Sequence, residues 1–103
     1  MNYANRLGYS DVEPFEVVRR VSDKTLEVRP MKAERDPSWQ MDFRPGGFLG
    51  TVVNQNDQKW IISSHPEGRV FRIRLRKDGF WYSPYGDRYK LADRPVRFYD
   101  YNF

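Results

Sequence analysis

The segment 69–76 most tightly constrains the fold, because its apolar and cationic residues alternate. The apolar set is Phe71, Ile73 and Leu75, and the cationic set is Arg72, Arg74 and Arg76. A strand turns successive side chains to opposite faces, so this pattern predicts a strand with an apolar inner face and a cationic outer face. Asp78-Gly79 follows, and we expect both residues to take the positive φ of a tight hairpin turn before a returning strand at 80–82.

The composition predicts one small domain without disulfides. The chain has 103 residues, enough for one modest core. Aromatic residues make up 17% of it, and large rings fill a small core efficiently. The absence of cysteine excludes disulfides and thiolate metal sites. No stretch has the pattern of a signal peptide or a membrane span, so we expect a cytoplasmic protein, in the host cell if it is viral.

Short strand-like segments separated by turn residues continue through most of the chain. They are 15–21, 26–29, 48–54, 59–63, 71–75, 80–82 and 88–91. This spacing predicts an all-β fold, a single small antiparallel SH3-like barrel of about five to seven short strands, over residues 1–103. We expect Val17, Val28 and Trp60 to share the core with the apolar face of 71–75. Residues 1–14 should form a packed N-terminal arm, and the aromatic tail 96–103 should pack on the barrel.

One long loop is predicted at 32–48, because Pro37, Pro45 and the following glycines interrupt any regular element. Loops of this length are uncommon in compact domains and are often functional. Trp39, Met41 and Phe43 alternate within it. Two interpretations stay open: these side chains plug the end of the barrel, or they form an exposed recognition surface.

Residue types that support catalysis are sparse. His65 is the single histidine and begins a Pro-Gly turn, where a polar residue caps the turn. The acidic residues lack metal-ligand spacing, and no phosphate-binding glycine loop is present. We therefore predict that the protein is not an enzyme and needs no cofactor and no metal.

The arginines of 69–76 are the strongest functional signal. Arg72, Arg74 and Arg76 on one face repel one another unless an anion lies opposite, and Arg19, Arg20 and Arg29 could lengthen the patch. Tyr82 and Tyr85 flank the hairpin, and aromatic rings beside arginines suit stacking on unpaired bases. The alternative is that the arginines pair with acidic residues across strands or are merely solvated, and that most of the rings belong to the core.

Several short segments of the sequence have residue patterns that together resemble those of other small proteins. They are the turn Pro66-Glu67-Gly68-Arg69, the aromatic–arginine strand, the turn Asp78-Gly79-Phe80-Trp81, the ending Tyr99-Asp100-Tyr101-Asn102-Phe103, and the early pair Tyr9-Ser10-Asp11 and Phe15-Glu16-Val17-Val18. With these motifs the chain resembles small, mostly uncharacterised proteins of phages and prophages. The resemblance implies an SH3-like barrel and a viral or mobile-element setting. It implies no activity and no site residue.

Together these features predict a non-enzymatic binding module, a phage or mobile-element accessory protein. The first hypothesis is nucleic-acid binding through the arginine–aromatic strand face, which the net charge of +4 permits. The second is binding and inhibition of a host protein, such as a defence nuclease, through the loop that contains Trp39 and Phe43. We expect no membrane partner, and either a monomer or a homodimer formed by strand addition.

Overall fold

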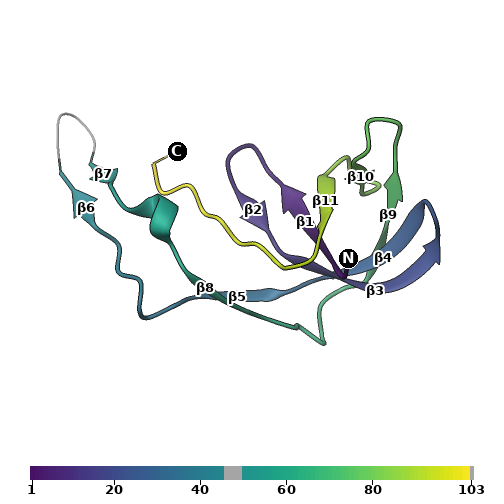
Figure 1. Ribbon diagram of the computed structural model, residues 1–103, viewed down its shortest axis with the longest axis horizontal. Helices are drawn as coiled ribbons and strands as arrows, with labels where there is room; N and C mark the ends of the chain where they lie inside the picture. The colour runs from purple at the N-terminus through teal and green to yellow at the C-terminus, as the bar shows by residue number, and fades with distance from the viewer. Residues whose placement is uncertain (46–49, 103) are drawn as a thin grey trace.

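The computed structural model describes residues 1–45 and 50–102, which form a β-barrel with a hairpin extension on one side. Figure 1 shows the barrel on the right and the extension reaching to the left. The extension consists of residues 31–64 without 46–49. It makes the molecule elongated, with principal extents of 50 × 27 × 21 Å.

Six antiparallel strands close into the barrel. They are β1 (Tyr3–Leu7), β3 (Phe15–Ser22), β4 (Thr25–Pro30), β9 (Phe71–Leu75), β10 (Trp81–Tyr82) and β11 (Arg88–Ala92). The order is β11-β10-β9-β4-β3-β1, and pairing of β1 with β11 closes the ring. The short strand β2 (Val12–Glu13) pairs with β1 outside the ring. The predicted all-β fold with a single small antiparallel barrel is therefore confirmed, and the N-terminal arm supplies one of its strands.

The β9–β10 hairpin forms where the Asp-Gly pair predicted it, but with a different turn. Gly79 has φ +86°, whereas no described non-glycine residue, Asp78 included, has a positive φ. The amide of Gly79 donates to the carbonyl of Arg76 at 3.0 Å, and the amide of Arg76 donates to that of Phe80 at 3.0 Å. A type I turn followed by one left-handed glycine gives this pattern, so only the glycine needs a positive φ.

The core contains the inward residues of all six barrel strands. The buried members are Ala4, Phe15, Leu26, Val28, Ile73, Trp81 and Tyr89, with Val17, Phe71, Leu75 and Leu91 packed against them. The inward parity predicted for β9 is thus correct. Two rings pack edge to face against Phe15, with centroids 5.7 Å away for Phe71 and 5.2 Å away for Tyr89. Burial raises the pKa of Tyr89 to about 12.

The extension consists of two short ladders in series. β5 (Lys32–Arg35) pairs with β8 (Trp60–Ser63), and β6 (Phe43–Arg44) pairs with β7 (Thr51–Val52) farther out. The 3₁₀ turn η1 (Gln55–Asp57) joins β7 to β8. The segment 32–48, predicted as a loop, therefore carries β5 and β6, while 46–49 lie outside the described residues.

Two sequence predictions fail in the extension for one reason. The strand predicted at 48–54 corresponds in its described part to β7, and the strand predicted at 59–63 to β8, and both belong to the extension and not to the barrel. Trp60, predicted to be in the core, consequently lies half-buried on β8, with the Arg97 guanidinium 5.2 Å from its ring centroid. A strand pattern reports that residues alternate, but it does not report which sheet the strand joins.

The C-terminal tail joins the two parts. The amide of Val96 donates to the side chain of Asn5 in β1 at 2.9 Å, and Phe98 forms a β-bridge with Val12. Beyond Phe98 the tail runs along the extension, as Figure 1 shows for its yellow trace. The amide of Asp100 also donates to Asp11, between β1 and β2, at 2.8 Å, so the tail contacts both parts of the molecule. Phe103, the last residue of the predicted tail, lies outside the described residues.

Candidate functional site

Arg74 on the outer face of β9 belongs to a row of residues that lie opposite one another on neighbouring strands. Arg74 is opposite Thr25 of β4 on one side and Tyr82 of β10 on the other. Tyr82 is in turn opposite Arg88 of β11. Residues opposite one another in antiparallel strands point to the same face of the sheet. The row therefore places Tyr82 between two arginines, Arg74 and Arg88.

A shallow groove lies along this row. It is lined by Arg72, Arg74, Arg76, Tyr82, Ser83 and Pro84 and has a volume of about 460 Å³. The structure therefore brings together four of the residues singled out from the sequence. All three arginines are exposed, so their charges face solvent and not the barrel core.

The three arginines of the groove differ in how far neighbouring side chains engage them. The Arg76 guanidinium lies 4.1 Å from the ring centroid of Tyr82, and the Tyr82 hydroxyl donates to Asp78. That hydrogen bond is the main cause of the lowered pKa of Asp78 and of the raised pKa of Tyr82. Arg72 contacts Glu27 at 3.4 Å. Within residues 1–45 and 50–102, Arg74 makes neither an ion pair nor a ring contact.

The other predicted arginines differ in how well they are neutralised. Arg19 pairs with Glu27 at 2.8 Å, and the Nε of Arg29 donates to Glu16 at 3.0 Å. The Arg29 and Glu16 side chains are only 23% and 17% exposed, so this pair ties β4 to β3. Cross-strand pairing, the alternative open at the start, is therefore what the structure shows for Arg19 and Arg29, and also for Arg72, which is opposite Glu27. Arg20 is exposed on β3 and has no ion pair in the described part of the chain.

Trp39 and Phe43 lie in the extension, so neither of them plugs the barrel. Trp39 is 8% exposed and stacks on Tyr101 of the tail, with centroids 5.8 Å apart. Its ring is therefore covered by this chain and is not offered to a partner. Phe43 is 56% exposed, and its ring covers Gly50 so closely that a Cβ there would lie 1.8 Å from it.

Arg88 belongs to the surface but was missed by the sequence reasoning. Its guanidinium lies 4.6 Å from the ring centroid of Phe80, and it ends the row through Arg74 and Tyr82. Arg88 could have been assigned to this surface only from the register of β10 with β11. A short last strand of the type at 88–92 gives no register from its own sequence, because only its partner fixes it.

Comparisons with known proteins add no candidate. No protein-family model matches the chain, and no curated protein or solved structure matches it either. Across the two described ranges, no three acidic or histidine side chains gather where they could hold a metal ion. The same residues include no helix with the length and hydrophobicity to cross a membrane.

Proposed function

We propose that this chain is a non-enzymatic module that binds nucleic acid through the groove on the outer face of β9 and β10. The observation that carries the proposal is that Arg72, Arg74 and Arg76 line one groove with Tyr82, while Arg74 makes no ion pair among the described residues. Cations in a row on a strand suit a polyanion, because each bound phosphate releases condensed counterions. In the setting that the resemblance implies, the partner would be viral or host nucleic acid.

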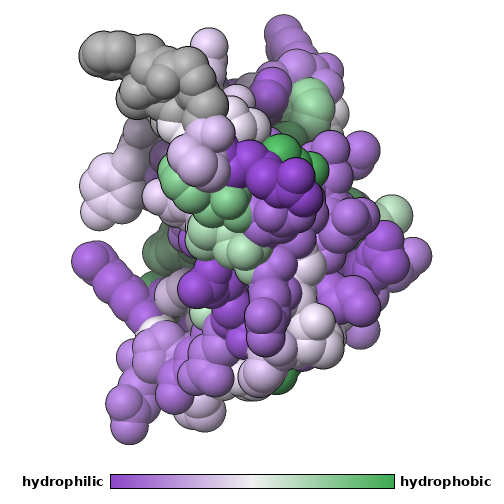
Figure 2. Space-filling model, turned by 90° about the vertical axis from the view of Figure 1, so that its left-hand side faces the viewer, coloured by the Kyte–Doolittle hydropathy of each residue, from purple (hydrophilic) through white to green (hydrophobic). Residues whose placement is uncertain are grey.

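The alternative partner, a host protein bound through 32–48, has weaker support. Trp39 is buried against the tail and cannot anchor an interface. Figure 2 views the molecule from the side of the extension, and apolar side chains appear there in patches among hydrophilic ones. Interfaces that bind proteins tightly centre on a desolvated cluster of aromatic residues. The cationic groove is therefore the better supported site.

The test is to remove the charge of the groove and keep its length and polarity. We expect the protein to bind a labelled oligothymidylate at low salt. Changing Arg72, Arg74 and Arg76 to Gln should then reduce the slope of log K against log salt by about two units, since each phosphate contact with a single strand contributes about 0.7. Fluorescence anisotropy over a salt series measures this slope.

A control variant removes the same three charges elsewhere. Lys32, Arg44 and Lys59 are exposed on the extension, and changing all three to Gln should leave the slope unchanged if the groove is the site. An equal loss of slope in both variants would show that only net charge matters. No binding at low salt would overturn the proposal and favour the protein partner, which a pull-down from the host with nuclease treatment would then seek.

A further inference from the structure

A second, apolar groove adjoins the arginine groove. It is lined by Phe15, Pro30, Arg69, Phe71, Pro84 and Tyr85 and has a volume of about 380 Å³. Pro84 lines both grooves, so they adjoin at the β10–β11 turn. A row of cations thus leads directly to a hollow walled by rings at the end of the barrel.

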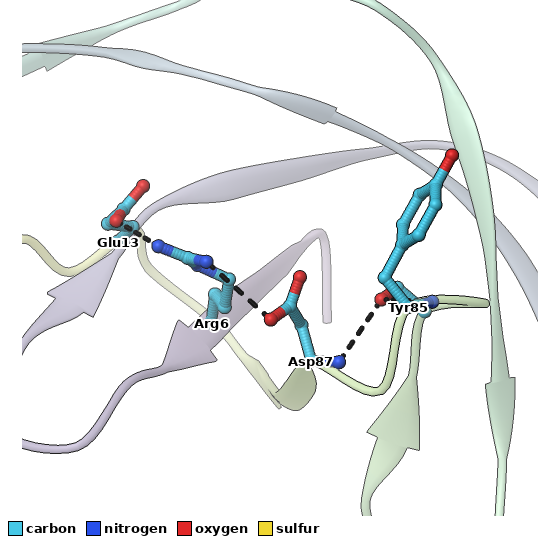
Figure 3. A network of polar contacts seen from close by, with 5 residues as sticks. Arg6, Glu13, Tyr85 and Asp87 are labelled. Atoms are coloured by element: carbon cyan, nitrogen blue, oxygen red, sulfur yellow. Dashed lines mark hydrogen bonds and ion pairs between the residues drawn. The ribbon is translucent and has the colours of Figure 1, made fainter.

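The most exposed ring of this hollow stands on a turn fixed by hydrogen bonds. The buried Ser83 hydroxyl accepts from the amides of Tyr85 and Asp87, each at 3.2 Å, and the amide of Gly86 donates to the Ser83 carbonyl at 3.0 Å. Arg6 of β1 contacts the Asp87 carboxylate at 3.7 Å. Figure 3 shows the Tyr85 ring extending away from this polar network.

Tyr85 is 80% exposed, and unlike the exposed rings of Tyr9 and Phe43 it lines this apolar groove. Phe15 and Phe71 are held by the core through the edge-to-face contact at 5.7 Å, so their inward faces are occupied. Tyr85 has a preset backbone and a free ring. A preset aromatic side chain can stack on a flat partner at little cost in conformational entropy.

We propose that this second groove is a nucleobase pocket, and that the ligand is single-stranded nucleic acid with one base stacked on Tyr85 while the neighbouring phosphates contact Arg72, Arg74 and Arg76. The inference rests on the proposed function and goes beyond it by selecting single strands over duplex. Bases of a duplex are stacked and paired, so they cannot enter the groove without being extruded. The walls are rings, prolines and one arginine, so the pocket accepts every base by its flat face.

The experiment compares two labelled strands of equal length, an oligothymidylate and an abasic strand with the same phosphates. Stacking of one base on an aromatic side chain corresponds to about a 5- to 150-fold change in affinity. Wild-type protein should therefore bind the intact strand tighter than the abasic strand by a factor in this range. Tyr85→Ala should abolish that preference and leave the salt slope unchanged, whereas Tyr85→Phe should keep both.

Phe43→Ala is the matched control, because Phe43 is also an exposed aromatic residue but lies on the extension. It should keep the preference for the intact strand. Circular dichroism of Tyr85→Ala checks the fold, which should be intact since the ring is outside the core.

The outcomes separate the two proposals. If wild-type protein binds neither strand at low salt, the proposed function is overturned and the pocket assignment with it. If it binds both strands equally, or if Tyr85→Ala retains the preference, only the base pocket is overturned. If the protein binds both strands equally and also binds a proline-rich peptide in this second groove, the groove is a peptide-binding site and not a nucleobase pocket.

Discussion

The barrel and the extension are both antiparallel, but different groups hold their strands together. In the barrel the ring of strands closes on itself, and Ala4, Val28 and Ile73 are fully buried inside it. In the extension each ladder has only two strands, and Trp39 and Val52 are the buried apolar residues among those that the structure describes there. A two-stranded ribbon alone is marginal in water, so the extension needs support from elsewhere.

That support comes from side-chain amides that pair with backbone across the tail. Asn102 accepts from the amide of Val52 at 2.7 Å and donates to its carbonyl at 2.8 Å. Gln58 does the same with Tyr99, at 2.9 Å in each direction. An amide side chain offers N–H donors and a carbonyl acceptor side by side, so it can pair with the N–H and C=O of a peptide backbone. In the barrel, the backbone groups at strand edges pair with the backbone of the next strand. In the extension, the side-chain amides of Asn102 and Gln58 pair with backbone groups instead.

The largest predicted difference between the two parts is the loss of stability when one isoleucine in each is changed to alanine. Ile73→Ala removes a fully buried side chain and should cost about 2–5 kcal/mol. Ile61→Ala removes a side chain that is 51% exposed on β8 and should change stability by no more than about 0.5 kcal/mol. Urea denaturation measures both, and similar losses would show that the core extends into the extension.

A smaller, local effect is predicted for truncation after Phe98. This variant keeps the bridge to Val12 but removes the residues that pair with Val52 and Gln58 and the ring stacked on Trp39. Each lost hydrogen bond contributes about 0.5–1.5 kcal/mol, so amides of β7 and β8 should exchange about tenfold faster or more. Amides of β4 and β9 should keep their protection in hydrogen exchange. Uniform loss of protection would mean that the two parts unfold together.

The sequence predicted the barrel better than the extension because the two parts encode their contacts differently. Alternation at Phe71–Leu75 reports burial, and burial is what closes the barrel. The pairing of Asn102 with Val52 spans half of the chain and leaves no periodic trace. The same contrast holds at the site. The arginines of one strand were visible as a pattern in the sequence. The position of Arg88 depends on strand register, and the apolar groove lined by Pro84 and Tyr85 depends on a turn, and the sequence alone fixes neither.

The smallest predicted effect concerns Glu27, which lies between Arg19 and Arg72 on the barrel. Its hydrogen bond from Arg19, and then that from Arg72, lowers its pKa. A lowered pKa stabilises the fold above the unfolded value of about 4.3, and this contribution is lost as the pH falls through the folded value. Glu27→Gln should therefore flatten the dependence of Tm on pH below about pH 5.

At neutral pH the same variant should bind oligothymidylate more tightly. Without the carboxylate, Arg72 is released to the groove, and the salt slope should rise by up to about 0.7. Asp42→Asn is the matched control, because the pKa of Asp42 is also lowered, by Arg44, on the exposed surface of the extension. Both variants add one positive charge, so equal gains in affinity would count against a localised site. A gain confined to Glu27→Gln would instead locate binding on the barrel face and leave the extension with a structural role.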